Sequence, residues 1–265
     1  AINNIMSKHF ITFGAGHKNY LYAGQRLTQQ AKNTKLFDSV GMYSLSHLQQ
    51  DKLFWNKHQS FISKNPRGFG FWLWKSYIIK KKMDQMKDGD ILLYLDVGCE
   101  IDVSKKSSLE KCFTIVVEDK IIGTMCGKET DGHLEKHWTK KDLFLKLQMN
   151  ESTYSDTVQR QGGTNMFYVC DETRKLVNEW YDISCIYHLL NDSRSVNPNY
   201  PGFREHRHDQ SIFSLLTKKH GLFSKTSLYN CGVLVERNIS GLSNIGKEKK
   251  EKKEKRSNKM KMIIL

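Results

Sequence analysis

The sequence predicts a single α/β domain in which helices flank a mixed, mostly parallel central sheet. Its first 43 residues follow the order strand, glycine loop, helix, strand. Residues Ile91–Leu95 (ILLYL) form a continuous apolar run, which is typical of a central strand covered on both faces. Strand-like and helix-like segments then alternate without an internal repeat or a linker. We therefore expect one domain over residues 7–246 and a separate tail over residues 247–265.

The first elements are defined by their composition and by the glycines between them. Lys8–Phe13 is a short β-rich run that Gly-Ala-Gly interrupts at residues 14–16. A helix is expected over residues 20–32, a strand over residues 35–43 and a polar helical region over residues 45–64.

An aromatic cluster follows a turn at residues 65–68. Four of the six residues in FGFWLW, residues 69–74, are aromatic, and Lys75 comes directly after them. Ile79, Met83 and Met86 then form one apolar stripe at helical spacing. The cluster is explained mostly by core packing, although Lys75 could reach a diphosphate.

The second half of the chain continues the alternation. We expect strands over residues 121–126 and 165–170, and helices over residues 139–147, 173–190 and His208–Lys219.

The charge is strongly basic, and much of it lies at the end of the chain. The sequence holds 42 Lys and Arg against 28 Asp and Glu, for a net charge of +14, which suggests anionic partners. The stretch 247–261 alone contributes +6. This tail is expected to be a solvated helix or disordered, and the alternative is a segment that contacts a membrane or a nucleic acid.

Several classes of protein are disfavoured. No apolar run approaches the ~18–20 residues of a membrane-spanning helix, and no secretory signal is recognisable at the N-terminus. The six cysteines are scattered without a CxxC pair, which favours free thiols and a cytoplasmic location.

The first candidate site residue is Asp96, directly after the apolar run at residues 91–95. A carboxylate at the carboxyl end of a buried strand faces the crevice where open α/β sheets bind ligands. Glu100 and Asp102 lie nearby, so Mn²⁺ or Mg²⁺ could bind there together with substrate phosphates. The alternative is that Asp96 only begins a turn completed by Gly98.

The second candidate is the polar segment FREHRHDQ, residues 203–210. Arg204 could bind phosphate oxygens, His208 could bind a metal, and Asp209 could accept a proton. The simpler alternative is that Asp209 is the N-cap of the following helix within a solvated basic loop.

Two glycine-containing turns are weaker candidates. Gly162 and Gly163 precede a strand and would let a ligand approach the backbone closely, or they form only a turn or bulge. The loop beginning at Phe13 and Gly14 could bind a nucleotide, although it lacks a full glycine fingerprint.

Taken in order, these motifs resemble the small GT-A-fold glycosyltransferases of large DNA viruses and bacterial polysaccharide loci. The resemblance covers residues 8–230 and rests on GFGFWLWK, DGDILLYLDVG, RQGGTNMFYV and EHRHDQSIFSLL. It implies a nucleotide-diphosphate sugar donor, a glycan or other hydroxyl acceptor, a divalent metal and, if the source is viral, the host cytoplasm.

The resemblance also implies roles for individual residues. Asp96 matches the first acid of a metal-binding DxD element, whereas Gly98 stands where the second acid would be. If the anomeric centre inverts, Asp209 is expected to be the base on the acceptor side, and if the configuration is retained that base is not required in the same role. His208, as a polar residue beside Asp209, is expected to be a second metal ligand. The donor is expected to contact the residues Phe13, Gly14, Lys75, Asp96, Gly162, Gly163 and Arg204.

Two other functions remain open from the sequence. The basic charge and the aromatics could serve nucleic-acid binding, although no RRM, KH or helix-turn-helix signature is present. The domain could also bind a nucleotide sugar without turning it over.

Overall fold

A five-stranded sheet forms the centre of the computed structural model, which describes residues 6–127 and 132–245. The expected tail over residues 247–265 lies outside the described residues. The strand order is β2 (Ser39–Tyr43), β1 (Lys8–Phe13), β3 (Ile91–Leu95), β6 (Thr164–Tyr168) and β5 (Ile121–Ile122). β6 runs antiparallel to both of its neighbours, and the other strands share one direction. The prediction of a mixed, mostly parallel sheet is confirmed.

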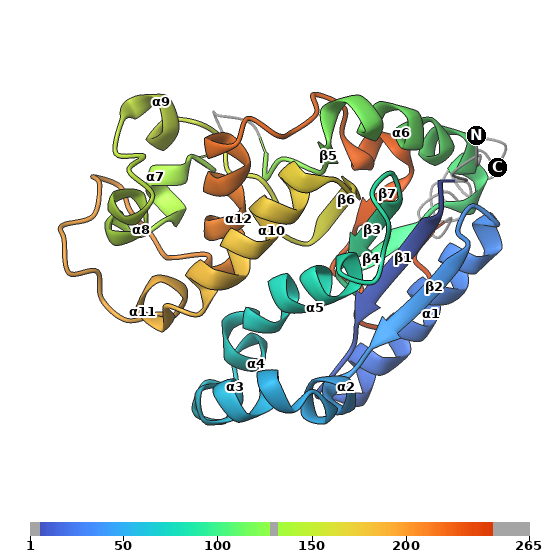
Figure 1. Ribbon diagram of the computed structural model, residues 1–265, viewed down its shortest axis with the longest axis horizontal. Helices are drawn as coiled ribbons and strands as arrows, with labels where there is room; N and C mark the ends of the chain where they lie inside the picture. The colour runs from blue at the N-terminus through green and yellow to red at the C-terminus, as the bar shows by residue number, and fades with distance from the viewer. Residues whose placement is uncertain (1–5, 128–131, 246–265) are drawn as a thin grey trace, which may run out of the picture.

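Helices cover both faces of this sheet, as the apolar run predicts. All five residues of β3 are fully buried. Leu92 and Tyr94 pack into the core beneath α5 (Leu73–Met83), α10 (Asp171–Ser184) and α12 (His208–Lys219). Figure 1 shows these helices together on one side of the sheet.

The other face of the sheet has its own core. Ile91, Leu93 and Leu95 point there, toward α1 (Lys18–Thr34) and α6 (Lys106–Asp119). Successive residues of a strand point to opposite faces, so an unbroken apolar strand is stable only between two apolar layers.

Shorter elements connect these layers. They are α2 (Leu45–Gln50), α3 (Lys52–Lys64), α4 (Gly68–Phe71), β4 (Cys99–Ile101), α7 (Glu135–Trp138), α8 (Lys141–Lys146), α9 (Ser152–Ser155), α11 (Tyr187–Leu190), β7 (Val233–Val235) and the 3₁₀ turns Val103–Lys105 and Leu228–Cys231. Some predicted bounds were too long. The expected strand over 121–126 is reduced to β5, and the expected helix over 173–190 is divided into α10 and α11.

The end of the described chain is fastened back onto the domain. β7 pairs antiparallel with β4, and residues 236–245, the C-terminal strap, follow it. The buried guanidinium of Arg26 donates hydrogen bonds to the carbonyl oxygens of Val97, Cys99, Asn238 and Ser240, at 2.7–3.0 Å. Four backbone carbonyls thus bind one buried cation, two of them from the strap.

A buried carboxylate provides the second attachment of the strap. Glu100 accepts hydrogen bonds from the Asn238 side chain at 2.7 Å, the Asn244 backbone at 2.8 Å and the Ser243 hydroxyl. Burial by itself would raise the pKa of Glu100, but these hydrogen bonds hold it below its ordinary value.

All six cysteines carry free thiols, and Cys99, Cys112 and Cys231 are buried. Within the described ranges, no helix combines the length and the apolar composition needed to cross a membrane.

We expect Leu93→Ala to lower the free energy of unfolding by about 2–5 kcal/mol, because it leaves a cavity in the middle of the sheet. Leu53→Ala is the matched control, since that side chain is 88% exposed, and it should change stability by less than about 0.5 kcal/mol. Urea unfolding of both variants checks this. Equal losses would contradict the placement of β3 at the centre.

Candidate functional site

The strand directions bring three sequence-distant segments to one edge of the sheet. β1 and β3 are parallel neighbours, so their carboxyl ends, at Phe13 and Leu95, lie side by side. β6 is antiparallel to β3 and begins at the same edge, where Thr164 pairs with Leu95. The backbone N–H of Asp96 donates a hydrogen bond to the carbonyl of Gly163 at 2.8 Å. The predicted Asp96 and glycine turns therefore meet.

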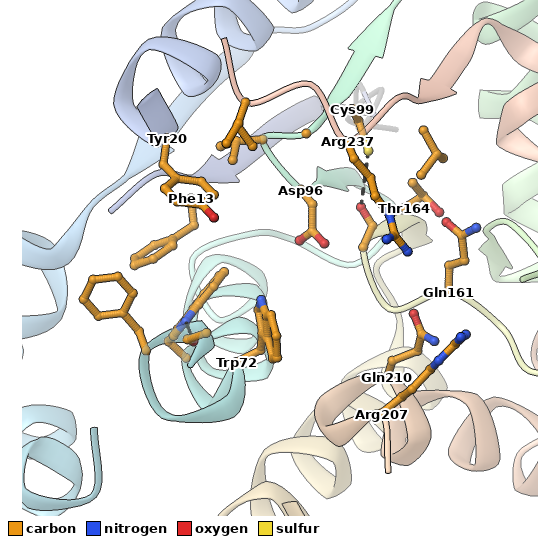
Figure 2. Close-up of a pocket in the computed structure, with 18 of the residues that line it drawn as sticks. Phe13, Tyr20, Trp72, Asp96, Cys99, Gln161, Thr164, Arg207, Gln210 and Arg237 are labelled. Carbon is orange, nitrogen blue, oxygen red and sulfur yellow. Dashed lines mark hydrogen bonds between the residues drawn. The ribbon is translucent and has the colours of Figure 1, made fainter. Parts of the chain in front are cut away.

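A pocket of about 640 Å³ opens at this edge, and Asp96 lines it. Figure 2 shows an aromatic side of the pocket around Phe13, Tyr20 and Trp72. The opposite, polar side carries Gln161, Arg207, Gln210 and Arg237. Asp96 lies between the two sides.

The aromatic side depends on an unusual stretch of backbone. Phe69, Phe71 and Trp72 all have φ between 53° and 60°, a left-handed conformation that is costly for residues other than glycine. A Cβ at Gly68 would lie 2.5 Å from the Trp72 indole, and one at Gly16 would lie 2.8 Å from the Phe69 ring. Glycine at these two positions allows the rings to pack against the backbone and face the pocket.

Asp96 is held by two partners from below the pocket. Its Oδ1 accepts a hydrogen bond from the Tyr94 hydroxyl at 2.5 Å and lies 3.3 Å from Lys75 Nζ. The same ammonium lies 2.9 Å from Asp209 Oδ2. The Lys75 and Asp209 side chains are only 4% and 5% exposed, whereas the Asp96 side chain is 41% exposed. We call Lys75, Asp96 and Asp209 the carboxylate–lysine cluster.

Burial sets the charges of this cluster. It raises the pKa of Asp209 to about 6, against the pull of Lys75 and with a further contribution from Asp96. Burial alone would lower the pKa of Lys75, but the two carboxylates outweigh it and raise that pKa. Burial and Asp96 also raise the pKa of Tyr94, so its hydroxyl remains protonated and donates to Asp96.

The glycines of the site are required by close approaches. A Cβ at Gly163 would lie 2.2 Å from Asp96 Oδ2, and one at Gly162 would lie 3.1 Å from Gln210 Cα. Gly163 therefore makes room for the Asp96 carboxylate, and Gly162 lets α12 approach. Gly14 serves packing too, because a Cβ there would lie 2.5 Å from Met42 Cε.

The structure places the Asp209 carboxylate behind the pocket wall. It is buried and does not line the pocket. It is not the N-cap either, because α12 begins at His208 with Arg207 as N-cap. Lys75 is likewise behind the pocket wall rather than in contact with its contents. The carboxylate that faces the pocket is Asp96.

Arg204 and His208 also point elsewhere. The Arg204 guanidinium lies 5.3 Å from the Trp138 ring and does not line the pocket. His208 is stacked on Phe71, and its Nε2 lies 2.7 Å from Asp192 Oδ1. The structure therefore does not join His208 to Asp96 in one site.

The residues present do not fit a divalent-metal site. Both oxygens of Asp96 lie within 3.4 Å of the Lys75 ammonium, so a metal ion would have to bind beside a built-in cation. Within residues 6–127 and 132–245, no group of three or more His, Cys, Asp and Glu side chains is placed to hold a metal ion. The expected pairing of Asp96 and His208 around Mn²⁺ or Mg²⁺ has no counterpart in this donor set.

The sequence did not identify Arg207 or Arg237 as site residues. Arg207 belongs to the polar segment over residues 203–210, but nothing in that segment shows which of its two arginines faces the pocket. Arg237 has no signal in the sequence, because it reaches the pocket only through the pairing of β7 with β4.

Comparison with known proteins adds little to this geometry. No family model and no curated protein matches the chain. It is similar to the crystal structure of mouse xyloside xylosyltransferase 1 in its apo form, with a TM-score of 0.44 and 10% sequence identity, over 83% of this chain and 84% of that chain. A likeness of this size does not establish a shared activity.

We expect Asp209→Asn to remove a pH dependence of stability. The folded chain holds a proton on Asp209 up to about pH 6, whereas the ordinary value is 3.8. The resulting stabilisation is complete below about pH 4 and is lost as the pH rises through 6. The unfolding free energy of the parent, relative to the variant, should fall by roughly 3 kcal/mol over this range. Urea unfolding at pH 4–8 measures it.

Asp182→Asn is the control for this titration, because that carboxylate is exposed on α10. A stability difference between Asp209→Asn and the parent that does not change with pH would contradict the burial of Asp209.

Gly163→Ala should displace the Asp96 carboxylate and cost about 1–3 kcal/mol of stability, since the new methyl group overlaps Oδ2. Gly41→Ala is the control, because a Cβ there meets its nearest atom at an ordinary 3.9 Å. Crystal structures of both variants provide the measurement. An unmoved Asp96 in Gly163→Ala would show that the turn is looser than described.

Proposed function

We propose that this chain is a glycosyltransferase, which moves a sugar from a nucleotide-diphosphate donor to an acceptor hydroxyl. One observation carries the proposal. Asp96, the sole carboxylate among the described lining residues, lies between an aromatic surface and two guanidinium groups. An apolar ring, a reacting centre and a diphosphate would each meet a complementary group in such a pocket.

The aromatic side suits the flat parts of a nucleotide sugar. Nucleobases and the apolar faces of sugar rings bind to aromatic side chains by stacking. Phe13 is itself stacked on Trp74 at 3.8 Å between ring centroids, so this surface is already rigid. The expectation that the loop after β1 receives the base agrees with the positions of Phe13 and Ala15 in the pocket wall.

The size of the pocket also suits such a donor. A volume of about 640 Å³ is in the usual range for sites that enclose a small molecule or cofactor. The pocket lies at the carboxyl ends of β1 and β3, where open α/β sheets bind their ligands.

Asp96 is the group proposed to act on the acceptor. Transfer forms a bond between the acceptor oxygen and the anomeric carbon and breaks the bond from that carbon to the diphosphate. The acceptor proton passes to Asp96, which is exposed to the pocket and oriented by Tyr94 and Lys75. Asp209 and Lys75 are positioning residues in this proposal.

Asp96→Asn is expected to lower the turnover of the nucleotide-sugar donor by about 10²–10⁴-fold, because the amide cannot accept the proton. Release of nucleoside diphosphate is measured with a panel of nucleotide sugars, once with Mn²⁺ and once with EDTA. Asp182→Asn, an exposed carboxylate on α10, is the control and should turn over at the parent rate.

Two results would contradict the proposal. The first is full turnover by Asp96→Asn. The second is the absence of both binding and turnover of every nucleotide sugar by the parent chain.

A further inference from the structure

We propose that Arg207 and Arg237 form a clamp for a diphosphate, and that this clamp binds its ligand without a divalent cation. The identification of the ligand as the diphosphate of a sugar donor rests on the proposed function. The clamp itself is inferred from the positions, partners and backbone of the two arginines.

The two arginines reach the same side of the pocket from distant parts of the chain. Arg207 precedes α12, and Arg237 follows β7 in the C-terminal strap. Figure 2 shows both on the same side of Asp96, with Gln161 and Gln210 beside them. Guanidinium groups bind phosphate oxygens in a bidentate manner, and neighbouring amide groups can donate further hydrogen bonds.

Among the described residues, neither guanidinium is paired with a carboxylate, unlike other arginines of the chain. Arg67 and Arg174 form ion pairs with Asp192 and Asp88. In the ranges that the structure describes, no carboxylate forms an ion pair with Arg207 or Arg237. Two unpaired cations at one pocket wall favour an anionic ligand.

Arg207 is nevertheless held in place. Its guanidinium carbon lies 3.7 Å from the centroid of the Trp138 ring, which fixes the plane of the group without consuming its charge. A phosphate would therefore meet an oriented cation rather than a mobile surface side chain.

Arg237 is placed by a strained backbone. Its φ is 49°, in the left-handed region, and the next N–H, that of Asn238, donates to the Gly98 carbonyl at 3.0 Å. Conformations of this kind persist where the surrounding structure imposes them, often at functional sites. Arg26 and Glu100 hold the rest of the strap against the domain.

Gly98 explains why the strap and a second metal-binding acid exclude each other. A Cβ at residue 98 would lie only 3.1 Å from Arg237 Cα. The backbone that brings Arg237 to the pocket therefore occupies the space that a side chain at residue 98 would need. Backbone atoms of Arg237 and Asn238 thus lie where the resemblance implies the side chain of a second acid.

The carboxylate–lysine cluster affects the charge that a diphosphate would meet in the pocket. Lys75 lies within 3.4 Å of both carboxylates and offsets the negative charge that Asp96 would otherwise present to a diphosphate. A bound metal commonly supplies this neutralisation at phosphate sites, whereas here a buried ammonium supplies it.

The test uses inorganic pyrophosphate as the probe, since it carries the diphosphate without a base or a sugar. Isothermal titration calorimetry in EDTA is run on the parent and on Arg207→Gln, Arg237→Gln and the double variant. Each single change should weaken binding by about 10- to 100-fold, because it removes a charge-assisted contact. Arg194→Gln, an exposed arginine in a loop, is the control and should bind as the parent does.

Gly98→Ala is a second, independent variant. It leaves both guanidinium groups in the chain but moves the backbone of Arg237, so it should weaken pyrophosphate binding in the same direction as Arg237→Gln. Circular dichroism confirms that each variant is folded.

The proposal is overturned if the parent binds pyrophosphate only with Mn²⁺ or Mg²⁺, if it does not bind at all, or if the arginine variants bind like the parent. The proposed function can fail independently of the clamp. Metal-free pyrophosphate binding without turnover of any nucleotide sugar would support the clamp and refute the transferase. Turnover that requires Mn²⁺ and is unchanged in both arginine variants would support the transferase and refute the clamp.

Discussion

The rest of the site depends on the ion pairs that the Lys75 ammonium forms with Asp96 and Asp209. Two carboxylates this close would repel each other, and burying either one alone would be costly. Lys75 reaches them from α5, beneath the aromatic stretch at residues 68–72. One buried side chain thus connects the carboxyl end of β3, the first turn of α12 and the aromatic side of the pocket.

The strand directions explain why these groups meet. If β6 ran parallel to β3, its carboxyl end, rather than its start, would lie at the pocket, and Gly162 and Gly163 would be at the far edge of the sheet. The antiparallel strand brings a glycine turn beside Asp96, and α12 packs against that turn through Gln210. The site is therefore assembled from a parallel half, which supplies Asp96 and the aromatic loop, and an antiparallel half, which supplies the glycines.

Local patterns in the sequence were sufficient to predict the central strand, the last long helix and the position of Asp96. The unbroken run ILLYL predicted β3 with its bounds, and the bounds expected for α12 are also those of the structure. The position of Asp96 followed from the end of that strand. Helix α6 was not among the expected elements, although Leu109, Cys112, Phe113 and Val116 have helical spacing and are all buried.

Other parts of the site could not be predicted, because they depend on tertiary packing. Asp209 and Arg207 are two residues apart, yet one is buried against Lys75 and the other faces the pocket. Their order in the chain does not say which way each side chain turns at the start of a helix. Arg237 becomes a pocket residue only through a strand pairing and a strap that no local pattern indicates.

The attachment of the strap has a consequence for how the protein is made. Arg26 and its acceptor Ser240 are separated by 214 residues, and the carbonyl of Asn238 is almost as distant. During synthesis on the ribosome, Arg26 emerges long before these partners exist. The central strands and α1 can pack early, but the buried guanidinium lacks two of its four carbonyls until the strap has been translated. The polar side of the pocket is thus completed late in biosynthesis, and a ribosome-bound chain that stops before the strap would carry the aromatic side and Asp96 without Arg237.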